Sequence, residues 1–78
     1  MSPTDPIRIA VPLRVAVEFV ALVSAYSDTL RGSVEGAGYD FDPIETLRQL
    51  LTAALPFETG SEEYYQFLDQ IRGDRGKS

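Results

Sequence analysis

Three carboxylates have the types and spacing to do chemistry: Asp40, Asp42 and Glu45, in the stretch YDFDPIETLRQLL. Calcium and magnesium take several oxygen ligands from one short loop, so such a cluster could hold an ion. An EF-hand loop beginning at Asp40 would need glycine at its sixth position and glutamate at its twelfth, where the chain has Glu45 and Leu51. The spacing therefore does not predict a metal site.

The same stretch has the pattern of a helix start. Asp42 as N-cap, Pro43 in the first turn and Glu45 three residues after the cap form a capping box, with Phe41 before it as a hydrophobic staple. Asp40 has no part in this cap. Since it lies between Tyr39 and Phe41 after a glycine-rich segment, we expect these three residues to contact a partner protein.

Glu18 is the other candidate, an acid within an otherwise apolar stretch, where burial could make it a general acid or base. Arg14 lies four residues earlier, however, and predicts an ion pair along one helix edge. The chain has neither cysteine nor histidine, which excludes disulfides and Cys/His zinc sites. No nucleophile and base are paired, so we expect a non-enzymatic protein without cofactor or metal.

The N-terminal third carries two overlapping periodicities. Apolar residues alternate from residue 7 to residue 19, which is typical of a strand, while a helical stripe begins at Val15. Pro12 separates the two, because proline is tolerated at a strand edge or in the first turn of a helix. We predict a short strand at about 7–11 and a helix at about 13–31; a strand that continues to about residue 19 is the alternative.

Two further helices are predicted, which makes the chain mainly α. Gly32 is the expected end of the first helix, the second spans about 43–55 and stops at Pro56, and the third spans about 62–72. Thr59 or Ser61 can cap the third helix. We expect a single small domain over residues 1–72 and a flexible polar tail over 73–78.

The first predicted helix is apolar nearly all round between Val15 and Tyr26. Such a helix in a 78-residue chain needs either a central position between the other helices or a partner chain. We expect a homodimer that buries part of it, with an interface formed by Ile9, Val11, Val17 and Val20.

Twelve acids against seven bases give a formal net charge of −5, which favours a partner with a basic surface over nucleic acid or a membrane. Neither a signal peptide nor a transmembrane stretch is evident in the sequence, so a cytoplasmic location is expected. We predict a protein-binding regulator or inhibitor. Acids and rings of the second half are its predicted contact residues: Tyr39, Asp40, Phe41, Glu58, Glu62, Glu63, Tyr64 and Tyr65. One of Tyr64 and Tyr65 should point inward and the other outward.

An alternating N-terminal segment followed by two helices resembles the ribbon-helix-helix DNA-binding family over about 50 residues. The resemblance implies that IRIAV, residues 7–11, is a ribbon that enters the major groove from a dimer, with Arg8 and Ala10 facing outward. The ribbon carries one cation, the linker between helices is long, and the body is acidic. DNA binding is therefore the alternative to protein binding.

Overall fold

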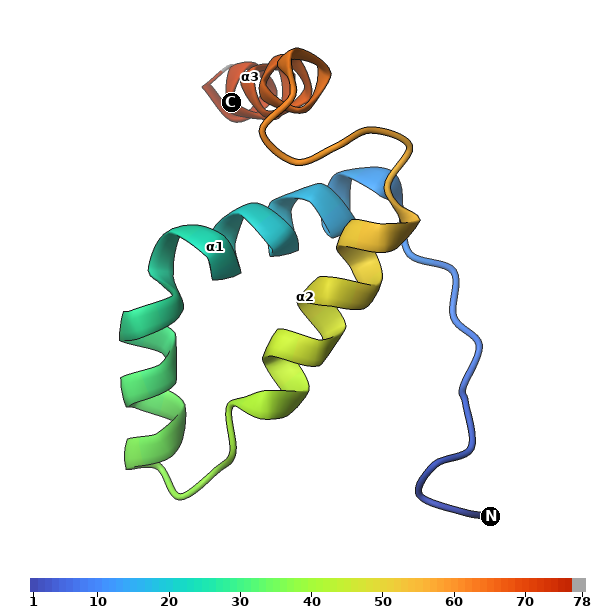
Figure 1. Ribbon diagram of the computed structural model, residues 1–78. Helices are drawn as coiled ribbons and strands as arrows, with labels where there is room; N and C mark the ends of the chain where they lie inside the picture. Colours follow the sequence, from blue (N-terminus) through green and yellow to red (C-terminus); the bar gives the residue numbers. More distant parts are fainter. Residues whose placement is uncertain (77–78) are drawn as a thin grey trace.

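The computed structural model describes residues 1–76, which form three helices (Figure 1). Helix α1 spans Leu13–Gly36, α2 spans Asp42–Ala54 and α3 spans Glu62–Gly76. The chain turns back after α1 so that α2 lies alongside it, and α3 crosses the first half of α1 on another side (Figure 1). A mainly helical chain with three helices is thus confirmed.

Helix α1 is the central element. It contacts both other helices, whereas no Cα atoms of α2 and α3 lie within 8 Å of each other in the described chain. Val17 is fully buried and packs with Tyr64 and Ile71 of α3. This central position accounts for only part of the apolar character of α1, since Val15, Leu22 and Tyr26 are 52%, 52% and 58% exposed.

The predicted N-terminal strand is wrong. Residues 7–11 run as an exposed segment outside any helix or strand, with Ile7 84% and Ile9 69% exposed. A period of two in the sequence is compatible with the two faces of a strand. A strand also needs a neighbouring strand for its backbone hydrogen bonds, and residues 1–76 contain no other strand that could supply them. The longer alternative is also wrong, because residues 13–19 are helical.

The predicted end of the first helix at Gly32 is wrong as well, because α1 continues to Gly36. Gly38 has the positive φ, 89°, that closes a helix. The Gly38 N–H donates to the Glu35 carbonyl at 3.0 Å, and the Tyr39 N–H donates to the Val34 carbonyl at 3.0 Å. This pair of bonds is a Schellman motif, which satisfies the last carbonyls of the helix.

Helix α1 is not straight. Tyr26 has non-helical backbone angles, φ −122° and ψ 26°, and the ribbon changes direction about halfway along the helix (Figure 1). The second half of α1 then leads into the turn before α2 (Figure 1). The bend therefore sets where that turn lies.

The start of α2 differs from the predicted capping box. Phe41 is the residue directly before the helix and has near-helical backbone angles, φ −82° and ψ −19°. At this N-cap position no side chain forms a capping hydrogen bond. Asp40 instead accepts a hydrogen bond from the Asp42 N–H at 3.0 Å. Glu45 pairs with Arg48 one turn further on rather than reaching back to the helix end.

The start of α3 is confirmed, because the Tyr64 N–H donates to Ser61 Oγ at 3.3 Å. Its end is not at residue 72, since the helix includes residues 73–76 of the predicted tail. Ion pairs from Asp74 and Arg75 to α1 hold this last turn, which a sequence pattern cannot reveal. Residues 77 and 78 of that tail lie outside the described residues.

Candidate protein-binding surfaces

The predicted contact residues fall at the two ends of α2. Tyr39, Asp40 and Phe41 precede its first turn, whereas Glu58 and the other four follow its last. A 13-residue helix is about 20 Å long. The structure therefore does not bring the eight residues together in one site.

The group before α2 has mainly structural roles. Phe41 is 1% exposed, and the guanidinium carbon of Arg31 lies 4.6 Å from its ring centroid, a cation–π contact. The Asp40 carboxylate accepts the Asp42 N–H. Only Tyr39 offers a ring to a partner, at 74% exposed.

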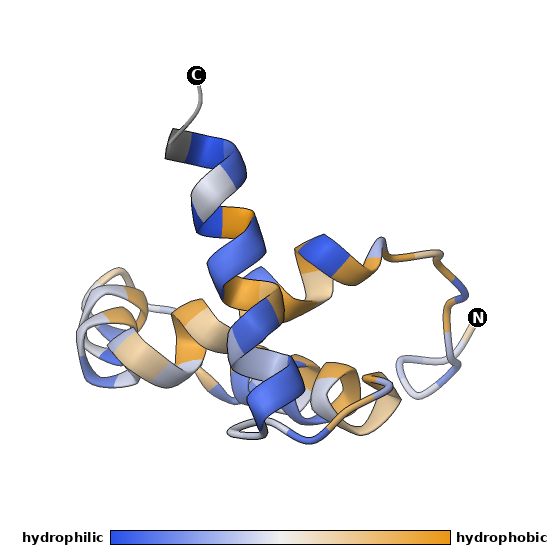
Figure 2. Cartoon of the chain, turned by 90° about the horizontal axis from the view of Figure 1, so that it is seen from above, coloured by the Kyte–Doolittle hydropathy of each residue, from blue (hydrophilic) through white to orange (hydrophobic). Residues whose placement is uncertain are grey.

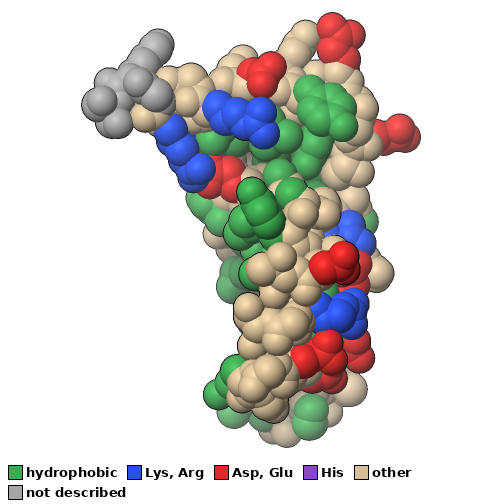
Figure 3. Space-filling model, turned by 90° about the vertical axis from the view of Figure 1, so that its left-hand side faces the viewer, with side chains coloured by type: hydrophobic (Ala, Val, Ile, Leu, Met, Phe, Trp, Pro, Cys, Tyr) green, Lys and Arg blue, Asp and Glu red, His purple; other side chains and the backbone are tan. Residues whose placement is uncertain are grey.

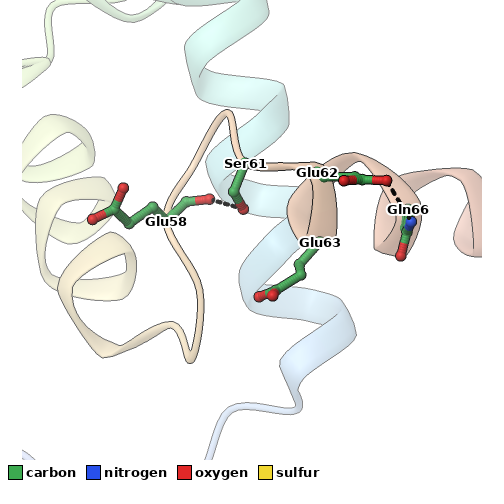
Figure 4. A pocket seen from close by; sticks show the side chains of 5 residues that line it. All are labelled: Glu58, Ser61, Glu62, Glu63 and Gln66. Atoms are coloured by element: carbon green, nitrogen blue, oxygen red, sulfur yellow. Dashed lines mark hydrogen bonds between the residues drawn. The ribbon is translucent and has the colours of Figure 1, made fainter.

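Of the group after α2, the three acids line an open pocket of about 400 Å³ at the start of α3, shown in Figure 4, whereas Tyr64 and Tyr65 do not. We call it the acidic pocket; its lining residues are Glu58, Ser61, Glu62, Glu63 and Gln66. The Ser61 hydroxyl donates to the Glu58 carbonyl at 2.6 Å and so fixes the loop that leads into the helix. The Glu62 carboxylate accepts a hydrogen bond from Gln66 Nε2 at 3.2 Å.

The carboxylates of the acidic pocket have no cationic neighbour in the part of the chain that the structure describes. No Arg or Lys nitrogen within residues 1–75 lies within 4 Å of Glu58, Glu62 or Glu63. Glu62 and Glu63 also occupy the first turn of α3, where the helix dipole stabilises negative charge. Among the described residues, the negative charge of the pocket is therefore balanced by no Arg or Lys side chain within 4 Å.

The three carboxylates do not converge on one point. Glu62 turns toward Gln66, while Glu58 and Glu63 extend away from it (Figure 4). In the part of the chain that the structure describes, no three acidic side chains are grouped closely enough to hold a metal ion. Such dispersed carboxylates suit several ammonium or guanidinium groups of a partner better than a single ion.

The two tyrosines beside the pocket point in different directions, as predicted. Tyr64 is 7% exposed and packs edge-on against Phe57, with ring centroids 6.3 Å apart. Tyr65 is 57% exposed, and its ring lies 5.4 Å from that of Tyr64. Burial, and next the neighbouring Tyr65, raise the pKa of Tyr64. Tyr65, which does not line the acidic pocket, is thus the more exposed of the two rings near the start of α3.

The predicted dimer residues are also divided. Val17 and Val20 are 0% and 1% exposed, so both are used by the core of the chain itself. Ile9 is exposed and Val11 half-buried, and both line an open groove of about 570 Å³. This apolar groove lies between the N-terminal segment, the first turn of α1 and one face of α2; its most relevant residues are Ile7, Ile9, Val11, Leu47, Leu50 and Ala54.

The α2 side of the groove was missed from the sequence. The apolar stripe of α2 predicts a buried face, yet no residue of α2 is fully buried, and Leu50 is 64% exposed. Figure 2 shows hydrophobic stretches along both the N-terminal segment and the helices. The sequence does not reveal that α2 packs against one neighbouring helix only, which leaves part of its apolar face exposed.

Glu18 is paired and is not an isolated acid. Its predicted ion pair with Arg14 is confirmed at 3.3 Å, and Arg75 contacts its other oxygen at 2.6 Å. Figure 3 shows a face on which acidic and basic side chains lie next to one another, with hydrophobic side chains between them. The Glu18 carboxylate itself is compensated by two arginines, in contrast to the carboxylates of the acidic pocket.

Comparisons of the chain with protein-family models, with curated proteins and with solved structures find no match. Within residues 1–76, no helix is both long enough and apolar enough to cross a membrane.

Proposed function

We propose that this protein is a non-enzymatic protein-binding module that works in the cytoplasm, as a homodimer, and regulates or inhibits a partner with a basic surface. The observation that carries the proposal is the acidic pocket. Its three carboxylates have no cationic neighbour in the described chain, and the exposed Tyr65 follows two of them near the start of α3.

The pocket offers two complementary contributions to binding. Lys and Arg side chains of a partner would supply the positive charge that the carboxylates lack, and the net charge of −5 would speed the encounter. A tyrosine ring adds contact area at a low cost in conformational entropy. Acids specify a basic partner, and Tyr65 anchors it.

The experiment is capture from lysate of the host cell, at about 0.05 M and about 0.5 M salt, with bound proteins identified by mass spectrometry. We expect specific partners at low salt that are depleted at high salt, because exposed charges are screened. In the variant Glu58→Gln/Glu62→Gln/Glu63→Gln the same partners should be lost even at low salt.

The matched control is Asp28→Asn/Glu35→Gln/Asp69→Asn. It removes the same charge from exposed positions that form no ion pair in the described residues. Retention of partners by this control and not by the pocket variant supports the acidic pocket. Equal retention by the two variants would show that net charge alone, or another surface, makes the contact.

The DNA-binding alternative is tested on the same purified protein. A salt-sensitive shift of duplex DNA would favour it, since phosphate neutralisation dominates such binding. On the protein-binding proposal, duplex DNA is not shifted, because the acidic surface repels its phosphates.

A further inference from the structure

The single chain exposes more surface than a compact protein of its size. A folded monomer of 8.6 kDa exposes about 4,700 Å², whereas this chain exposes 6197 Å². Its radius of gyration is 14.5 Å, against about 11.5 Å for a compact domain of 78 residues. The excess of about 1,500 Å² exceeds the roughly 800 Å² that each partner buries in a standard interface.

Several exposed apolar side chains lie at the apolar groove. Ile7, Ile9 and Leu50 are 84%, 69% and 64% exposed, and none of the described residues that line the groove is charged. Contiguous apolar surface of this kind marks a site of association. A basic partner would find no acid there to recognise, so the groove differs in kind from the acidic pocket.

We infer that the apolar groove is the interface of a two-fold dimer, in which a second copy of this chain covers it. Ile7 and Ile9 of each protomer pack against α2 of the other, at the partner's Leu47 and the partner's Leu50. The inference rests on the homodimer in the proposed function and adds the surface that forms it.

A second copy suits the groove for two reasons. One surface carries both a protruding apolar segment, residues 7–11, and an apolar helix face beside it, so two copies can exchange the same contact, as a two-fold interface requires. The absence of lining charges also lets two chains of net charge −5 meet without placing carboxylates opposite one another. The acidic pockets share no lining residue with the groove and stay available.

The test is sedimentation equilibrium of the purified full chain, with no partner present. We expect twice the chain mass of 8.6 kDa, and Leu50→Glu should weaken the dimer by about 100-fold or more, because the substitution enters a two-fold interface twice. The matched control is Leu22→Glu, which adds the same charge at a leucine that is 52% exposed and does not line the groove. It should leave the dimer intact.

A second variant guards against misfolding of the first. Ile9→Glu lies outside every helix, so it should keep the helical circular dichroism of the wild type while dissociating the dimer. A monomeric wild type, or a dimer that survives both groove variants, would overturn the inference. If the wild type is a monomer that binds an apolar dye, and Leu50→Glu abolishes the dye binding, the dimer inference is overturned and the groove is a small-ligand site.

These outcomes are independent of those for the acidic pocket. A groove variant that becomes monomeric but still retains basic partners in the capture experiment supports both proposals. Failure of the capture with a dimer that responds to Leu50→Glu would remove the basic partner and leave the interface standing.

Discussion

Arg75 Nη2 donates a hydrogen bond to Glu18 Oε2 at 2.6 Å, across 57 positions of sequence. The other oxygen of Glu18 faces Arg14 at 3.3 Å, and Arg14 in turn lies 3.8 Å from Asp74. These alternating charges join the beginning of α1 to the end of α3. They hold α3 in place where its contact with α1 is otherwise limited to a few apolar side chains.

We predict that Glu18→Gln lowers the free energy of unfolding by about 1 kcal/mol, since it breaks two partly exposed ion pairs. The measurement is urea unfolding at low salt and again at about 1 M salt, where the loss should largely disappear. The control is Glu35→Gln, an exposed acid of α1 outside these pairs. An equal loss in the control, or one that persists undiminished at high salt, would contradict this role.

Half of this arrangement could be predicted from the sequence. The Arg14–Glu18 pair follows from a spacing of four residues on one helix. The contact with Arg75 depends on how α3 crosses α1, and no local pattern encodes that crossing. For the same reason the sequence predicted a tail where the structure has a further helical turn.

Gly38 and Gly32 should respond to alanine in opposite directions. Gly38→Ala should destabilise the protein by about 1–2 kcal/mol, because φ is 89° there and a side chain is strained in that region. Gly32→Ala should stabilise it by about 0.5–1 kcal/mol, because Gly32 is within α1 and a Cβ would meet nothing within 4 Å. Thermal unfolding of both variants measures this, and a loss at Gly32 would show that the helix ends there after all.

The segment RGSVEGAG shows why helix ends are hard to predict. The helix ends within this segment, residues 31–38, but the segment offers several glycines for the closing position, and the predicted one, Gly32, is wrong. The continued helix places Arg31 over the ring of Phe41, the residue before α2, a contact that comes from the turn between the helices and not from local sequence. Local preference alone could not choose between the glycines.

Because of Glu45, the free energy of unfolding should decrease at acidic pH. Its hydrogen bond from Arg48 is the main cause that lowers its pKa below the ordinary value of 4.5. A lowered pKa in the folded state means that the stabilisation is present above about pH 4.5 and is lost as the pH falls below it. Thermal unfolding between neutral and acidic pH should show a smaller acid-induced decrease for Glu45→Gln than for the wild type. The same decrease in both would contradict it.

The acids around α2 were predicted in kind but not in detail. The predicted start of the helix at about residue 43 is confirmed to within one residue, because α2 begins at Asp42. The side chain that accepts a backbone N–H belongs to Asp40, because Phe41 already has near-helical backbone angles. Which acid serves the helix start depends on the turn from α1, and that turn is set by the position of Gly38.

Because of Tyr64, the free energy of unfolding should decrease at alkaline pH. Burial, followed by the neighbouring Tyr65, raises its pKa above 10.0, so the folded chain holds the phenol proton more tightly than the unfolded chain. The stabilisation is therefore complete below about pH 10 and is lost as the pH rises through the raised pKa. Tyr64→Phe should reduce the alkaline decrease in unfolding temperature, whereas Tyr65→Phe should not. Equal effects would show that the two rings do not differ in environment.

The apolar groove could be predicted only in part. The period-two pattern of residues 7–11 predicts an apolar strand face with Ile9 and Val11 in a dimer interface, but the apolar face of the second helix is not predicted to share that surface. The structure leaves the two faces next to each other and open. A sequence pattern shows that a face is apolar, whereas the packing of the whole chain decides whether anything covers it.

The most direct test of the acidic pocket is an NMR titration of the ¹⁵N-labelled chain with the purified protein that low-salt capture retains. We predict chemical-shift changes centred on the backbone amides of residues 58–66, which are absent for Glu58→Gln/Glu62→Gln/Glu63→Gln. Changes confined to residues 39–41 or to the apolar groove, or changes that persist in that variant, would contradict the account.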